Sequence, residues 1–276
     1  MTSGIDWQVT AGRSWADLYR KTDRSFAELT AHLLERLAPL PGTTVLDIGC
    51  GAGELSLAIA DARAAARVTG IDISEDLIAA ARERAGKRDH VQFALADASL
   101  WKPLGHAPDL LISRHGVMFF PDPPDAFAHL RQISAPGAAF AFSCFRTPRE
   151  NPWASDISAM LSAQGTAVVP SDPHASGPFA FADSEHVRAI LLAAGWTDIR
   201  FEAFNYAFVA GLGDNPIADA AEFFSHIGPA AAALRQLPEG ERADLQTRIN
   251  GWLEQHRDGD MVAFPGAAWI VTARNA

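Results

Sequence analysis

The sequence predicts an α/β fold with three layers, in which a doubly wound parallel sheet is covered by helices on both faces. Short apolar segments alternate with amphipathic segments between residues 43 and 145, and the apolar segments contain almost no polar positions. Strands of this kind are typical of parallel sheets that are buried on both faces. The 276 residues, of which 48% are hydrophobic, are enough for a sizeable core.

The individual elements follow from hydrophobic periodicity and from turn residues. Strands are expected at 43–47, 67–73, 91–94, 109–113, 138–145, 196–209 and 261–273. Helices are expected at 13–38, 54–66, 124–133, 183–194, 216–226 and 229–256, with a further helix that Ser74 can cap. Residues 146–183 are rich in Pro, Ser, Gly and Ala, and a stretch this long is usually an insertion or a lid.

The charge balance limits the classes of partner. The formal net charge is −10 and the chain has no dense cluster of Lys and Arg, which argues against nucleic acid and anionic lipid as partners. The N-terminus does not resemble a signal peptide, and no apolar run reaches the roughly 20 residues that a membrane span needs. We therefore expect a soluble, cytoplasmic protein with Cys50 and Cys144 as reduced thiols; a homodimer stays open.

A glycine-rich turn lies between the first strand and the following helix. Gly49, Gly51 and Gly53 have G-x-G-x-G spacing, whereas a dinucleotide fingerprint needs G-x-G-x-x-G. Glu54 stands where the third dinucleotide glycine would be, and a carboxylate there would face a pyrophosphate unfavourably. A P-loop is excluded because no Lys-Ser or Lys-Thr pair follows. The turn therefore favours a nucleotide-like ligand that is not a polyphosphate.

Two carboxylates follow at the next strand ends. Asp72 ends the second strand, where it can accept hydrogen bonds from both ribose hydroxyls, although a solvated residue before a helix is the alternative. Asp97 lies just past the third strand, where it can accept from an exocyclic amine such as that of adenine; a capping role in the loop is the alternative. Three such features at three successive strand ends favour a shared ligand over coincidence.

The segments VLDIGCGAG, GIDIS, LADA, ISRHGVMFF and AFAHLRQISAPG together resemble the class I S-adenosylmethionine-dependent methyltransferases. Among these, the chain looks most similar to the small-molecule branch that includes the ubiquinone and menaquinone C-methyltransferases. The resemblance covers roughly residues 40–145. It implies S-adenosyl-L-methionine as cofactor and a seven-stranded, mostly parallel sheet whose last strand is antiparallel, with helical insertions that form a lid.

The resemblance also implies roles for individual residues. Asp47 would orient the glycine turn and meet the methionine ammonium, and Gly49, Cys50, Gly51 and Gly53 would form the turn under the methionine part. Asp72 would hold the ribose, Ile73 would cover one adenine face, and Asp97 with the Ala98 amide would read the adenine edge. The backbone of Ser113 and Arg114 would lie near the methionine carboxylate.

Methyl transfer from a sulfonium is an in-line displacement, so a base is needed only if the acceptor loses a proton. His115, after the fourth strand, is the candidate general base, with a packing histidine as the alternative. His174 and His226 are expected at the surface, and no metal-binding motif is present in the sequence. Aromatic residues form either an acceptor pocket or ordinary core; they are Phe119, Phe120, Phe145, Trp153, Phe179, Phe181, Phe223, Phe224 and Trp252, with Met118 beside them.

The predicted organisation has four parts. An N-terminal helical lid (1–40) precedes a Rossmann-like, cofactor-binding core (41–145), an insertion over the active site (146–183), and the rest of the sheet (184–276) with a helical insertion at 211–260. The predicted function is methyl transfer to O, C or N of a small, largely apolar molecule. The alternatives are a non-catalytic protein that binds S-adenosylmethionine or S-adenosylhomocysteine, and a nicotinamide-dependent oxidoreductase, against which Glu54 argues. The sequence does not identify the acceptor.

Overall fold

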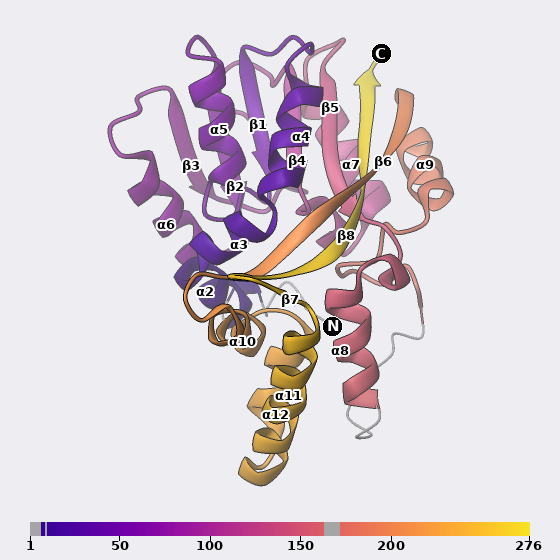
Figure 1. Cartoon of the computed structure of the whole chain (residues 1–276). Coiled ribbons are helices and arrows are strands. Elements are labelled where there is room, and N and C mark those ends of the chain that lie inside the picture. The colour runs from indigo at the N-terminus through magenta and orange to yellow at the C-terminus, as the bar shows by residue number, and fades with distance from the viewer. Residues whose placement is uncertain (1–6, 9, 163–171) are drawn as a thin grey trace.

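The computed structural model describes residues 7–8, 10–162 and 172–276, and it contains one sheet with the strand order β3-β2-β1-β4-β5-β8-β6 (Figure 1). The strands are β1 (Thr44–Ile48), β2 (Arg67–Asp72), β3 (Val91–Leu95), β4 (Leu110–Arg114), β5 (Ala139–Phe145), β6 (Trp196–Leu212), β7 (Arg257–Asp258) and β8 (Met261–Asn275). The first five are parallel, and β8 runs antiparallel to both β5 and β6. The predicted seven-stranded, mostly parallel sheet is therefore confirmed, and the two-residue β7, which pairs with β8, is an addition.

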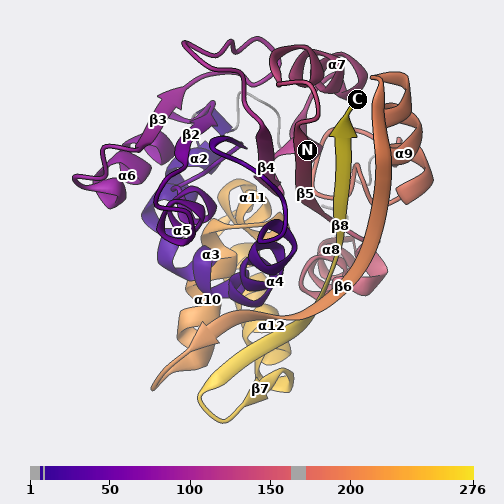
Figure 2. The same ribbon diagram turned by 90° about the horizontal axis from the view of Figure 1, so that it is seen from above.

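Helices cover both faces of this sheet, as expected for strands without a polar side. Viewed from above, α4 (Ala27–Leu37) and α5 (Glu54–Ala62) lie on one side, and α7 (Pro123–Ile133) and α9 (Ser184–Ala193) on the other (Figure 2). The helix α6 (Glu75–Ala85) packs on β2 and β3. Its N-cap is Ser74, whose Oγ accepts from the Leu77 amide at 3.4 Å, so the capping prediction is confirmed.

The antiparallel pair β6 and β8 extends well past the other strands. The helices α10 (Pro216–His226), α11 (Pro229–Gln236) and α12 (Glu239–Gln255) lie between these strands in sequence and beyond the carboxyl ends of the parallel strands in space (Figure 1). The helix α8 (Pro152–Ser162) packs against α11 in the same region. Two segments distant in sequence thus meet where a doubly wound sheet binds its ligands.

The single helix predicted over 13–38 is wrong, because the described chain forms α2 (Thr10–Asp17), α3 (Tyr19–Ser25) and α4. Leu18 and Phe26 leave the helical conformation, with φ near −110° and ψ of 21° and 11°. The bend at Phe26 turns its ring inward, where it is 4% exposed. Residues 1–6 and 9 of the predicted lid, and 163–171 of the predicted insertion, lie outside the described residues.

Three further boundaries differ from the prediction. Residues 146–183, expected to be irregular, contain a 3₁₀ turn (Pro148–Glu150) and α8, which begins at Pro152, a residue suited to the first helical turn. The helix predicted over 229–256 is split into α11 and α12 because Pro238 forces Leu237 into an extended conformation. The helix predicted over 54–66 ends at Ala62, because Arg63 leaves the helical conformation with φ −133° and ψ 72°; its guanidinium donates to the Leu37 and Gly42 carbonyls.

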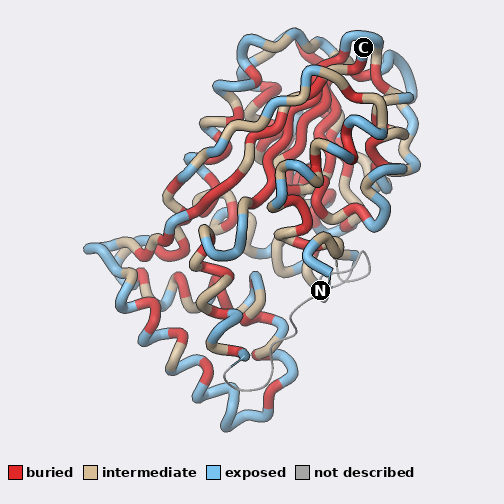
Figure 3. Tube along the Cα trace, turned by 90° about the vertical axis from the view of Figure 1, so that its right-hand side faces the viewer, coloured by how far each residue is buried: buried red, intermediate tan, exposed pale blue. Residues whose placement is uncertain are grey.

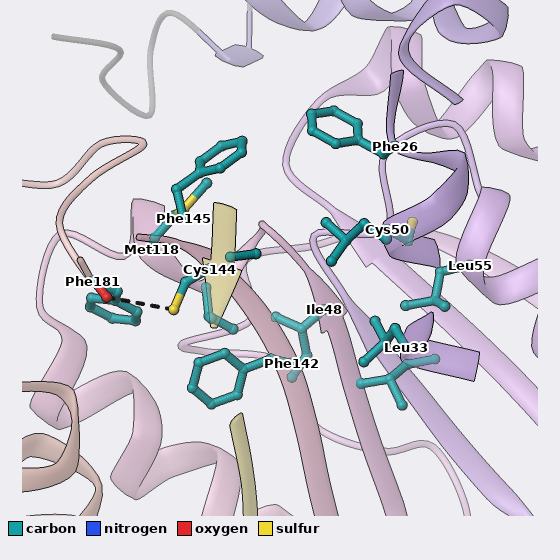
Figure 4. Packing of buried hydrophobic residues seen from close by; sticks show 14 of the residues in the cluster. Phe26, Leu33, Ile48, Cys50, Leu55, Met118, Phe142, Cys144, Phe145 and Phe181 are labelled. Carbon is teal, nitrogen blue, oxygen red and sulfur yellow. Dashed lines mark hydrogen bonds between the residues drawn. The ribbon is translucent and has the colours of Figure 1, made fainter. Parts of the chain in front are cut away.

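The core follows the strands, which form the most continuous run of buried residues in the molecule (Figure 3). On one face of β5, Cys144 points to Phe181, whose carbonyl accepts from the thiol at 3.6 Å, while Phe145 points the opposite way (Figure 4). Burial raises the pKa of Cys144, which fits its prediction as a core residue. Among the described residues, no helix combines the length and the apolar character needed to cross a membrane.

Candidate functional site

The glycine turn that follows β1 has a left-handed backbone, with φ of +64° at Gly49, +55° at Gly51 and +85° at Gly53. A Cβ at Gly49 would lie 2.8 Å from Gly116 Cα, so the turn touches the segment after β4 directly. A Cβ at Gly51 would meet no described atom within 4 Å. The turn is therefore tightly packed beneath and open above, which is the shape of a ligand cradle.

Asp47 lies under this cradle at the end of β1, and its side chain is 1% exposed. One carboxylate oxygen, Oδ2, accepts from Ser56 Oγ at 2.5 Å, and Oδ1 has no hydrogen-bond partner in the described structure. Burial raises the pKa of Asp47 to about 7, against the lowering effect of Ser56 and Arg114. An unpartnered buried carboxylate oxygen is a receptor for a cation or a strong donor.

Asp72 joins the turn to the next helix. Its Oδ2 accepts from the Gly51 amide at 2.9 Å and its Oδ1 from the Ser74 amide at 2.9 Å. Burial raises its pKa despite these two hydrogen bonds. Each carboxylate oxygen can accept a second donor, and the residue is only partly buried, so the carboxylate is both oriented and accessible. Ile73, the next residue, is partly buried beside it.

Asp97 and Ala98 follow β3, the strand next to β2. Asp97 is exposed, and its Oδ1 accepts from the Ser99 amide at 2.9 Å and from Ser99 Oγ at 2.7 Å. This contact is the capping role that the sequence left as an alternative. Ala98 is 7% exposed and packs into the core. Asp97 thus lies at the expected strand end with a local structural task.

The residues at the end of β4 fasten neighbouring elements together. Ser113 is fully buried, and its Oγ donates to the Ile48 carbonyl at 2.7 Å and accepts from the Gly116 amide at 3.2 Å. The Arg114 guanidinium forms an ion pair with Glu54 and donates to Thr30 Oγ1 at 2.7 Å. Only the backbone of these residues had been assigned a role. The sequence did not predict the ion pair, which gives Glu54 a partner beside the glycine turn.

His115 occupies an unusual position after β4. Its φ is +61°, which is uncommon for a residue with a side chain, and its side chain is nearly buried. Neither Nδ1 nor Nε2 has a hydrogen-bond partner in the described structure. Burial, with a smaller effect of Arg114, lowers the pKa of His115 well below 6.5, so the ring is neutral at pH 7. Buried, unpartnered polar atoms on a residue with positive φ keep His115 a candidate for the site.

The His115 ring belongs to a closed circle of five side-chain rings, here called the five-ring cluster: Phe26, His115, Phe145, Trp153 and Phe208. Going round it, neighbouring centroids are 5.3, 3.9, 5.1, 5.0 and 5.4 Å apart, from Phe26 through to Phe208 and back. Figure 4 shows Phe26 and Phe145, which come from the α3–α4 bend and from the end of β5. The other three members come from the end of β4, from α8 and from β6.

The structure divides the other aromatic residues predicted for a pocket. Phe179 contacts the five-ring cluster through Phe145, and Phe223 contacts it through Phe208; both centroid distances are 5.7 Å. The remaining members pack elsewhere: Phe120 and Phe181 contact Phe127, and Phe224 and Trp252 contact Phe264. Phe26 and Phe208 were missed, because nothing local in the sequence shows that residues 182 positions apart will touch.

His174 and His226, the other two candidate histidines, and the segment Met118–Phe119 lie at separate places in the structure. His226 is exposed at the end of α10, as expected, whereas His174 is half-buried and stacks on His186 at 3.7 Å. The Met118 and Phe119 carbonyls accept from the Gly177 amide at 3.2 Å and from Ser176 Oγ at 2.9 Å. Trp7 contacts Phe119 at 5.1 Å, so the N-terminal segment and the segment after residue 171 meet at this point.

The N-terminal helices lie directly on the cradle. A Cβ at Gly12 in α2 would lie 2.1 Å from Ser74 Oγ, so α2 contacts the residue that follows Ile73 as closely as its backbone allows. In α3, Asp23 forms an ion pair with Arg84 at 2.7 Å, and Arg84 also donates to the Ala52 carbonyl at 2.8 Å. Burial and the neighbouring Glu54 raise the pKa of Asp23. The helix α3 is thus fastened to the glycine turn.

No group of three or more His, Cys, Asp or Glu residues with metal-binding geometry is present in the described ranges. Both cysteines are buried as free thiols, and burial raises the pKa of Cys50 well above its ordinary value. The described residues therefore offer a ligand cradle and a neutral histidine within an aromatic environment.

A family model described as "Methyltransferase domain" matches residues 19–200. Trans-aconitate 2-methyltransferase from Variovorax paradoxus is 33% identical over 138 residues, which are 50% of this chain and 49% of that protein. Phosphoethanolamine N-methyltransferase 1 from Zea mays is 33% identical over 118 residues, 42% of this chain and 23% of that protein. The chain thus spans about half or less of the length of these curated relatives.

Solved structures share the fold at low sequence identity. Phosphoethanolamine N-methyltransferase 2 from Haemonchus contortus, in complex with phosphomonomethylethanolamine and S-adenosylhomocysteine, has a TM-score of 0.53 at 18% identity, covering 96% of this chain and 60% of that chain. The [4+2]-cyclase SpnF has a TM-score of 0.51 at 22% identity, covering 90% and 80%. These likenesses confirm the Rossmann-like fold that the resemblance implied, while the finer resemblance to the ubiquinone and menaquinone enzymes stays a prediction.

Proposed function

The chain belongs to the methyltransferase domain family, and from this premise we propose that it transfers a methyl group from S-adenosylmethionine to a small, largely apolar acceptor. The observation that carries the proposal is the adjacency of two features. The cradle of Gly49 and Gly51 touches Gly116. The residue before Gly116 is His115, whose unpartnered imidazole is part of the five-ring cluster. A donor in the cradle and an acceptor bound beside the five-ring cluster would therefore be neighbours.

The residues around the cradle fit S-adenosylmethionine. The buried Oδ1 of Asp47 lacks a partner and would suit the methionine ammonium. The open space above Gly51 would hold the methionine part of the cofactor. Asp72, oriented by two amides, would accept from the ribose hydroxyls. We assign Ile73, Ala98 and Asp97 to the adenine end, with Asp97 contributing less because its Oδ1 is engaged with Ser99.

When bound, S-adenosylmethionine supplies a methyl group already activated on a cationic sulfur. The task of the chain is to orient the acceptor and exclude water. The five-ring cluster provides an apolar wall, and α2, α3 and α8 lie around it. We propose that residues 1–40 and 146–183 act as covers that close this space.

His115 is the proposed general base for acceptors that must lose a proton, such as a hydroxyl group. A neutral imidazole can accept a proton, and both of its buried ring nitrogens lack a hydrogen-bond partner in the described structure. Its lowered pKa makes it a weaker base than an exposed histidine. It therefore suits proton transfer that accompanies methyl transfer rather than full deprotonation beforehand.

The test combines binding and turnover. Thermal-shift assays should show stabilisation by S-adenosylmethionine and S-adenosylhomocysteine and none by nicotinamide dinucleotides. The protein should then transfer labelled methyl from S-adenosylmethionine to at least one member of a panel of phenols, quinols and hydroxy acids. Stabilisation without turnover across the panel would favour a non-catalytic binder, and stabilisation by nicotinamide dinucleotides alone would refute the proposal.

A further inference from the structure

We propose that the outer edge of β6 is a homodimer interface, where β6 pairs antiparallel with β6 of a second copy of this chain about a two-fold axis at Phe201. This inference is independent of the proposed function. In the described sheet β6 is an outermost strand, and its strand partner is β8 (Figure 2). An edge strand keeps one row of backbone N–H and C=O groups that can pair with another chain.

The direction of these backbone groups follows from contacts at one end of β6. The Ala207 amide donates to Glu28 Oε2 at 2.8 Å, and the Val209 carbonyl accepts from Ser25 Oγ at 2.9 Å, so both residues point away from β8. The register with β8 is continuous from residue 200 to residue 209. Because outward and inward residues alternate, the backbone of residues 201, 203 and 205 also points outward, and these groups have no partner in the described structure.

The chain itself covers the two ends of this edge. Side chains of α3 and α4 bind the backbone of residues 207–210, and Arg188 of α9 donates to the Ile199 carbonyl at 3.0 Å. Between these contacts lie residues 200–206, here called the open edge. Its exposed members are Arg200, Ala203 and Asn205. The uncovered middle of the strand is therefore accessible to a second chain.

The charges of the open edge identify a second copy as the occupant and select its register. With the two-fold axis at Phe201, Arg200 lies directly opposite the partner's Glu202, and the pair occurs twice. An axis one residue away in either direction would place Arg200 or Glu202 opposite its own copy, which is destabilising. Arg200 has no ion-pair partner in the described structure, and Glu202, which binds Arg36 at 2.8 Å, keeps 41% of its side chain exposed. Charges that normally prevent edge pairing are thus complementary here.

Both sides of the sheet leave room for the second copy. A hollow of about 340 Å³ on the α4 side provides space for the partner's Arg200 beside Glu202. Its lining residues are Arg36, Arg200, Phe201, Glu202, Ile270 and Thr272. On the α9 side, the Arg188 guanidinium lies 4.9 Å from the centre of the Phe201 ring, and Leu192, one helical turn further, is 58% exposed. An exposed leucine beside the open edge offers an apolar contact.

The experiment is sedimentation velocity of the full chain over a concentration series. The unchanged protein should dimerise with a Kd of about 10 µM, as expected for a small interface. Arg200→Glu places two glutamates opposite each other at both symmetric positions and should weaken the dimer about tenfold or more. The matched control is Arg67→Glu, which makes the same charge change at an exposed position on β2 and should keep the Kd.

Hydrogen exchange then locates the interface. In the unchanged protein the amides of Phe201 and Ala203 should exchange about fivefold more slowly at about 100 µM than at about 1 µM, because pairing protects them. Arg200→Glu should show no such difference, and neither should β3, the other edge strand. The inference is overturned by a protein that stays monomeric, by an Arg200→Glu variant that dimerises as well as Arg67→Glu, or by a dimer that leaves these two amides unprotected.

Discussion

Replacing Asp47 by asparagine should stabilise the ligand-free protein at alkaline pH and weaken donor binding at the same time. In the folded chain burial raises the pKa of Asp47 from its ordinary 3.8 to about 7. Between these values the folded state binds more protons than the unfolded state, so stability falls as pH rises. The loss is about 1.4 kcal/mol per pH unit, or about 2–3 kcal/mol between pH 5 and pH 8. An asparagine side chain has nearly the same shape, keeps an oxygen for Ser56 and does not ionise.

The assay is urea unfolding of the unchanged protein and Asp47→Asn at pH 5, 6, 7 and 8, with the m-value checked at each pH. The comparison is made pH by pH because His115 acts in the opposite direction. Its pKa is lowered on folding, so its contribution to stability is lost as pH falls below about 6.5. That effect is common to both proteins and cancels in the difference. The difference should grow by about 2–3 kcal/mol in favour of the variant from pH 5 to pH 8, or about 5 °C in Tm.

Binding of S-adenosylmethionine supplies the second half of this test. An ammonium beside Asp47 favours the ionised carboxylate, so binding at pH 6 should release up to one proton from the unchanged protein and none from this site in Asp47→Asn. Calorimetry in buffers of different ionisation enthalpy measures the release. The variant should also bind the donor at least about tenfold more weakly. Stability curves that stay parallel from pH 5 to pH 8 would refute the assignment of a perturbed Asp47.

Four other substitutions test the remaining parts of the site. Asp72→Ala removes the acceptor for the Gly51 and Ser74 amides and should weaken donor binding about tenfold or more, whereas Asp97→Ala should have a smaller effect; calorimetry that ranks them the other way would contradict both assignments. His115→Phe should leave donor affinity unchanged, lower kcat about 10²-fold or more for hydroxyl acceptors, and remove the loss of stability below about pH 6.5. Gly12→Ala places a methyl group 2.1 Å from Ser74 Oγ and 2.2 Å from the Trp7 carbonyl oxygen, so α2 must shift away from Ser74 and the donor Kd should rise; a lower Tm with unchanged Kd would make α2 structural instead.

The cofactor half of the site could be predicted from sequence because its determinants are local. A strand, a glycine turn and a helix start lie within ten residues around Gly49–Gly53, and parallel strands bring Asp72 and Asp97 to the same edge of the sheet. The capping of α6 by Ser74 is likewise a contact between near neighbours. The antiparallel β8 was predicted only through resemblance to a family, since periodicity does not define strand direction.

The proposed acceptor half could not be predicted, because it depends on contacts between distant segments. Phe26 reads as one more apolar residue in a helical pattern, and only the bend between α3 and α4 directs its ring at His115. Tyr206 reads as part of a strand, and the position of its ring depends on Gly266, sixty positions later in the chain. The ion pair of Arg114 with Glu54 joins two residues whose separate positions gave no sign of a partnership.

This division has a consequence for what relatives can say about substrates. The family-matched region, residues 19–200, contains the cradle, Asp72 and His115 but ends before Tyr206 and Phe208. Two of the residues nearest to Phe26 therefore come from a part of the chain that the shared domain does not cover. The names of the relatives include an acidic acceptor, trans-aconitate. The five-ring cluster of this chain consists of neutral side chains, and the nearby Arg114 already forms an ion pair with Glu54. We propose that the strand ends of this fold hold the donor, and that the segments added after β5 select the acceptor. Similarity over half a chain is consequently good evidence for the donor and weak evidence for the acceptor, which has to be argued from the residues that surround it.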